Sequence, residues 1–83
     1  MQLLEVTQRT LEAYETRLLA KGEETRSAAA FNRILIECAT EAGIAAGLPA
    51  DLGALKPWQV AEWSLEINAH ISAAKSPPTE GES

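Results

Sequence analysis

Cysteine, aromatic residues and basic residues are scarce in this sequence. Its single cysteine, Cys38, excludes an internal disulfide and favours a reducing compartment, so we expect a cytoplasmic protein. Aromatic residues make up 5% of the 83 residues, so small and aliphatic side chains must fill the core. Twelve acidic residues outnumber seven basic ones, and the resulting net charge of −5 disfavours non-specific binding to nucleic acid or to an anionic membrane.

Long apolar runs and catalytic motifs are absent as well. No run approaches the roughly 18 residues that a membrane-spanning helix needs. The first 20 residues contain Glu5, Glu12 and Glu15 and no central apolar block, so we expect no signal peptide. We find no Ser/His/Asp set, no phosphate-binding glycine loop and no zinc-ligand spacing. The sequence therefore predicts a protein that is not an enzyme and carries no metal and no cofactor.

The clearest pattern lies at residues 57–75, where apolar residues recur at helical spacing behind Pro57, a residue suited to the first helical position. The main apolar face holds Val60, Trp63, Ile67, Ile71 and Ala74. We expect Ala61, Leu65 and Ala69 to widen this face. The polar residues Glu62, Glu66 and His70 should lie opposite it. Ser76-Pro77-Pro78 should end the helix, because proline disfavours helical geometry in the residue before it.

Two further helices are predicted at residues 3–21 and 25–46. Gly22 suits the position just past a helix end, and Gly43 marks either close packing or an early end of the second helix. The leucine-rich connector 47–55 should contain a helical turn at 49–53, and residues 76–83 should form a disordered tail. The predicted fold class is all-α. It is a single domain over 1–75, with an antiparallel helical hairpin and a third amphipathic helix.

Surplus apolar surface makes a protein-interaction module the leading functional hypothesis. A chain this short has a marginal core of its own and often gains stability by association. We predict a homo-oligomer acting as an adaptor, assembly factor or inhibitor, and small phage and mobile-element proteins offer an analogy. The predicted interface residues are Trp58, Ile36, Val6 and Leu19. Trp58 has an alternative position over the leucine-rich connector.

Binding of a small phosphate-bearing ligand or nucleotide is the alternative hypothesis. Four basic residues, Arg17, Lys21, Arg26 and Arg33, fall around the first interhelical turn, where they could bind an anion or remain ordinary surface charges balanced by glutamates.

Three further sequence patterns could indicate a functional site. Glu62, Glu66 and His70 could hold a metal or transfer protons, or simply form a solvated face. The alanine-to-glycine spacing of residues 39–43 is similar to a helix-turn-helix, which would need a recognition helix directly after Gly43. Cys38 and Tyr14 are predicted to lie in the core rather than in a reactive site.

Overall fold

The computed structural model of this protein describes residues 1–77 and is built around three helices. They are α1 (Gln8–Ala20), α2 (Ala28–Glu41) and α3 (Pro57–Lys75). Two 3₁₀ turns, η1 (Gly22–Arg26) and η2 (Leu52–Ala54), interrupt the connections. The short strands β1 (Gln2–Leu3) and β2 (Ala45–Ala46) pair antiparallel, with Gln2 opposite Ala46. The predicted all-α class is confirmed, and the two-residue strands are an addition that the sequence pattern did not predict.

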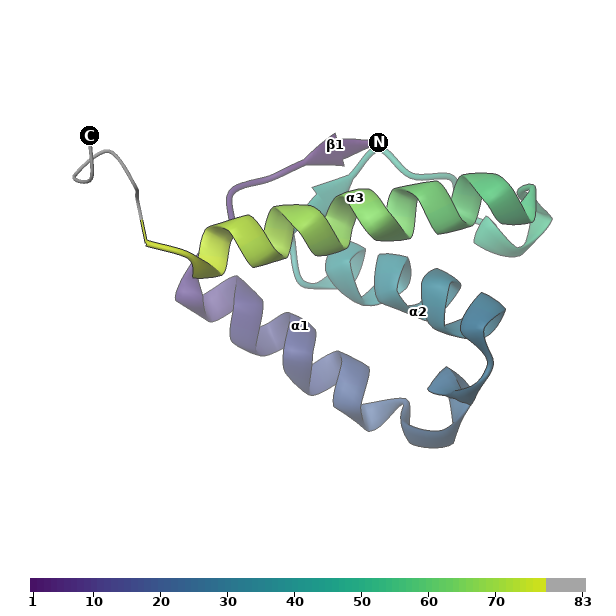
Figure 1. Cartoon of the computed structure of the whole chain (residues 1–83), viewed down its shortest axis with the longest axis horizontal. Helices are drawn as coiled ribbons and strands as arrows, with labels where there is room; N and C mark the ends of the chain where they lie inside the picture. Colours follow the sequence, from purple (N-terminus) through teal and green to yellow (C-terminus); the bar gives the residue numbers. More distant parts are fainter. Residues whose placement is uncertain (78–83) are drawn as a thin grey trace.

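Helix α2 is the central element, because it packs against both α1 and α3. In Figure 1, α1 and α2 run in opposite directions, and α3 lies along α2 on the side away from α1. An ion pair between Lys75 Nζ and Glu15 Oε2, 3.3 Å apart, links the end of α3 to α1. Contact with two neighbouring helices explains why the apolar face of α2 is so broad.

The core gathers side chains from all three helices and from the segment around β2. Its buried members are Tyr14, Ile34, Leu35, Ile36, Cys38, Ala39, Ile44, Ala45, Leu52, Val60, Ile67 and Ile71. The prediction that Ile36 adds exposed apolar surface is wrong, since its side chain is fully buried. Val6 is half-buried and packs against this core. Neither residue is therefore free to form an interface by itself.

The first helix begins at Gln8 rather than at residue 3, because Thr7 caps it. The Thr10 amide donates to Thr7 Oγ1 at 3.2 Å, and the Thr7 amide donates to Thr10 Oγ1 at 2.9 Å. This reciprocal capping box satisfies two amides that a longer helix would have used internally. The preceding residues are extended instead, and the Leu4 amide donates to the Ile44 carbonyl at 2.8 Å.

The second helix spans Ala28–Glu41, which is shorter at both ends than the predicted 25–46. Ser27 caps its start by accepting a hydrogen bond from the Ala30 amide at 3.3 Å. At its end Gly43 has a φ of +85°, and the amides of Gly43 and Ile44 donate to the carbonyls of Thr40 and Ala39. These two bonds form a Schellman motif, so Gly43 ends the helix early.

The third helix is confirmed over the predicted residues, 57–75, with Pro57 in its first turn. The predicted turn in the connector is present as η2, at 52–54 instead of 49–53, with Leu52 in the core. Asp51 Oδ1 caps this turn by accepting a hydrogen bond from the Gly53 amide at 3.1 Å. Of the predicted tail, residues 78–83 lie outside the described part of the chain.

Candidate protein-interaction surface

Large apolar side chains remain exposed on α3. Trp58 is 66% exposed and Leu65 is 71% exposed. They lie seven residues apart, which is about two helical turns and about 10 Å along the axis, so they share one face. Ala61 is a surface neighbour of both, three residues from Trp58 and four from Leu65, and exposed Ala69 continues the row. We call these four residues the α3 stripe.

The stripe lies on the side of α3 opposite the core. Leu65 is two residues before the fully buried Ile67, which at about 100° per residue places the two side chains nearly opposite each other. The prediction that Leu65 and Ala69 widen the core face is therefore wrong, since both are exposed. The same angular count could have found Leu65 from the sequence, because one helix cannot direct both residues at one core. Trp58 is exposed as the interface hypothesis expected.

Leu19, the other exposed residue among the predicted interface set, is 81% exposed but lies near the end of α1. It belongs to a different helix from the stripe. The structure therefore leaves Trp58 and Leu19 exposed but does not bring them onto one helix face.

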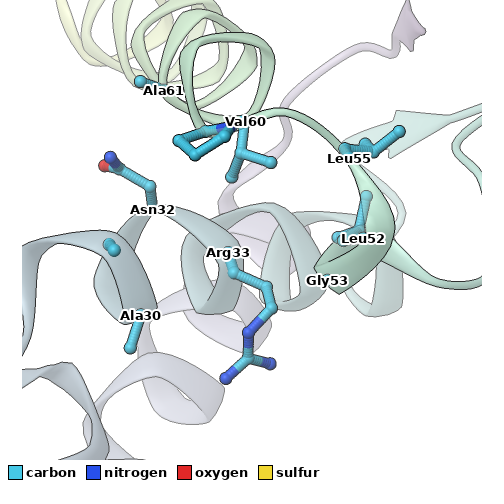
Figure 2. A pocket seen from close by; sticks show the side chains of 10 residues that line it. Ala30, Asn32, Arg33, Leu52, Gly53, Leu55, Val60 and Ala61 are labelled. Carbon is cyan, nitrogen blue, oxygen red and sulfur yellow. The ribbon is translucent and has the colours of Figure 1, made fainter.

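A groove of about 470 Å³ adjoins the stripe, between the N-terminal half of α2, the η2 turn and the first turns of α3 (Figure 2). Small and aliphatic residues form most of its walls. The lining residues are Ala29, Ala30, Asn32, Arg33, Leu52, Gly53, Leu55, Pro57, Val60 and Ala61. Ala61 therefore belongs both to the groove and to the α3 stripe, which makes the two features one continuous surface.

Arg33 gives the groove a basic edge. Figure 2 shows its guanidinium turned away from Val60 and Asn32. Arg33 Nη1 donates to Glu37 Oε2 at 2.9 Å, and both side chains are partly exposed. Since a guanidinium has five N–H donors, this bond leaves Arg33 able to donate to a further acceptor.

The four basic residues of the alternative hypothesis are largely paired with carboxylates. Three of them pair with glutamates: Arg17 with Glu41 at 3.4 Å, Arg26 with Glu23 at 3.2 Å, and Arg33 with Glu37 at 2.9 Å. Of the four, Arg33 lines the groove. Arg17, Lys21 and Glu37, the partner of Arg33, all lie near enough to Cys38 to influence the pKa of its thiol. Pairing with carboxylates weakens the case for a phosphate site at this end of the protein.

His70 is not on a solvated face, contrary to the sequence interpretation. Its side chain is half-buried, and its Nε2 lies 2.7 Å from the carbonyl oxygen of Leu4. Because a carbonyl only accepts, Nε2–H must be the donor. Glu62 and Glu66 stay exposed. Within residues 1–77 no three His, Cys, Asp or Glu side chains are grouped to hold a metal. His70 instead fastens the N-terminal segment to α3.

Cys38 and Tyr14 lie in the core, as predicted. Burial raises the pKa of the Cys38 thiol, which keeps the sulfur protonated and poorly nucleophilic. Burial, together with the charges of Cys38 and Glu15, raises the pKa of Tyr14 from 10.0 to about 12. Both groups therefore behave as packing residues at neutral pH.

A DNA-binding helix-turn-helix would need its recognition helix directly after Gly43. Residues 45–46 form strand β2 instead, and the next α-helix starts at Pro57. The alanine-to-glycine spacing therefore reflects the Schellman ending of α2.

A comparison of the chain with protein-family models, curated proteins and solved structures found no match. In the described part of the chain, none of the helices has both the length and the hydropathy that crossing a bilayer demands. The α3 stripe and its groove together form an exposed apolar surface in the described part of the chain.

Proposed function

We propose that this protein is a non-enzymatic interaction module that works as a homo-oligomer through the α3 stripe. The observation that carries the proposal is the exposure of Trp58 and Leu65 on one face of α3. Tryptophan is enriched among the residues that dominate interface energies. Burying a large apolar side chain fully is worth about 1.5–3 kcal/mol, so association has a clear driving force on this face.

Self-association is favoured because a chain of this length buries a smaller fraction of its surface on folding than a longer chain does. An 83-residue chain buries only about 60–65% of its unfolded surface. Homo-oligomers are most often two-fold dimers, in which the same patch of each copy meets its equivalent. We place the module in the cytoplasm, because Cys38 is a free thiol held in the core.

Sedimentation equilibrium over protein concentrations from about 1 to about 200 μM tests the proposal, since association follows mass action. We expect the wild type to associate within this range. Trp58→Ala combined with Leu65→Ala should remain monomeric. Leu19→Ala is the matched control, because it removes a leucine that is even more exposed from α1 and should leave association unchanged. A wild-type protein that stays monomeric at the highest concentration would refute the proposal.

A further inference from the structure

We infer that the groove beside the α3 stripe receives Trp58 of a second copy of this chain, in a two-fold pair whose α3 helices run parallel. This inference rests on the proposed function and adds the occupant of the groove and the geometry of the pair. The first observation is that Trp58 and the groove lie next to each other on α3. Pro57, Val60 and Ala61 line the groove, and Trp58 lies between them in sequence but points out of it, 66% exposed.

Size is the first argument for this occupant. A standard interface buries about 800 Å² per partner, which is about 15% of the 5508 Å² exposed by this chain. One aromatic side chain buries only about 150–250 Å², so Trp58 alone cannot make the interface. The stripe and groove together form a longer continuous apolar surface. The groove is also within the range of about 300–1,000 Å³ that holds compact ligands.

Charge complementarity is the second argument. Arg33 is the charged residue among those lining the groove, and its guanidinium keeps N–H donors beyond the one bonded to Glu37. Glu62 and Glu66 are exposed beside the stripe, on its other side. At about 100° per residue, Glu62 lies about 40° to one side of Trp58, and Ala61 lies about 60° to the opposite side. The surface therefore has a basic edge and an acidic edge with the apolar stripe between them.

This order of features decides how two copies can meet. A two-fold axis parallel to α3 puts the basic edge of each copy against the acidic edge of the other. An axis across α3 would make the helices antiparallel and would put groove against groove and glutamates against glutamates. The parallel pair also keeps Trp58 level with the groove, because the groove-lining residues Pro57 and Ala61 bracket it in sequence. Complementary edges fix register and suppress the wrong arrangement.

A charge-reversal cycle tests the contact between Arg33 and Glu62 of two copies. Arg33→Glu and Glu62→Arg should each weaken association about tenfold, and the double variant should recover most of that loss, because the repelling charges become complementary again. Glu62→Arg tests the contact without disturbing the core, since Glu62 is exposed. The same reversal of the exposed pair Arg26 and Glu23 is the control and should change nothing.

A cysteine cross-link tests the parallel direction. The axis of a parallel pair passes between Trp58 and the groove, where Ala61 lies. Ala61 therefore faces its own equivalent, and Ala61→Cys should oxidise to a covalent dimer. Ala20→Cys, an exposed position on α1, is the matched control and should not cross-link. Cys38 will not interfere because it is fully buried.

The outcomes separate the two proposals. A monomeric wild type overturns both. Association that Trp58→Ala abolishes, with additive charge reversals and no cross-link at position 61, overturns this inference and leaves the proposed function standing. Coupled reversals with the cross-link confirm it.

Discussion

Truncating two residues of α3 separately should show that its two faces have different roles. Ile67 is fully buried, whereas Leu65 is 71% exposed. Replacing a buried isoleucine with alanine costs about 2–5 kcal/mol, through lost burial and the cavity left behind. Surface substitutions stay within about 0.5 kcal/mol. The whole domain should be stable by about 4–12 kcal/mol at its length, so Ile67→Ala removes a large part of its stability.

Urea unfolding followed by far-UV circular dichroism measures both effects. The protein should be kept dilute, so that association does not add to the free energy of unfolding. We expect Ile67→Ala to lower that free energy by at least about 2 kcal/mol and Leu65→Ala to leave it nearly unchanged. Equal losses for the two variants, or a larger loss for Leu65→Ala, would refute the assignment of the core and exposed faces of α3.

Three further predictions concern other parts of the fold. Gly43→Ala should destabilise the protein by about 1–2 kcal/mol in the same urea assay, because a φ of +85° strains any residue with a Cβ. The single tyrosine, Tyr14, should titrate by absorbance near pH 12 in the native protein and near 10 in urea. The unfolded state then loses its proton first, so stability should fall by up to about 3 kcal/mol from pH 10 to 12. His70→Ala should lower the free energy of unfolding by about 1 kcal/mol. It should also speed hydrogen exchange of the Leu4 amide, which donates to the Ile44 carbonyl. Unchanged exchange would contradict the conclusion that His70 holds the N-terminal segment against α3.

The sequence predicts both ends of α3 to the residue because the signals that start and stop this helix are local. Pro57 fits only the first turn, and Ser76-Pro77 cannot continue a helix. The end of α2 is harder to predict, because residues 39–46 are mostly alanine and glycine. Their spacing allows the helix either to continue through Gly43 or to end there in a Schellman motif. The choice is made by tertiary contacts: Ile44 is buried and its carbonyl accepts from the Leu4 amide.

The N-terminal segment shows the limit of local patterns. Leu3, Leu4 and Val6 have helical spacing with the residues that follow, yet Thr7 caps α1 and the segment pairs with residues 45–46. A two-residue strand has too few positions to show alternation. The His70 contact is equally hidden, because its acceptor is a backbone carbonyl 66 residues away. Within the candidate surface, the sequence identified Trp58, while the groove depends on packing between α2, η2 and α3.

The most direct test of the account is the fluorescence of Trp58 as a function of protein concentration. Trp63→Phe removes the other tryptophan and leaves the exposed indole of Trp58 as the sole reporter. We predict emission typical of a solvated indole in dilute solution, shifting to the blue as the protein associates, with a midpoint that matches sedimentation. Association without any shift in Trp58 emission would contradict the claim that the α3 stripe is the surface through which copies of this protein meet.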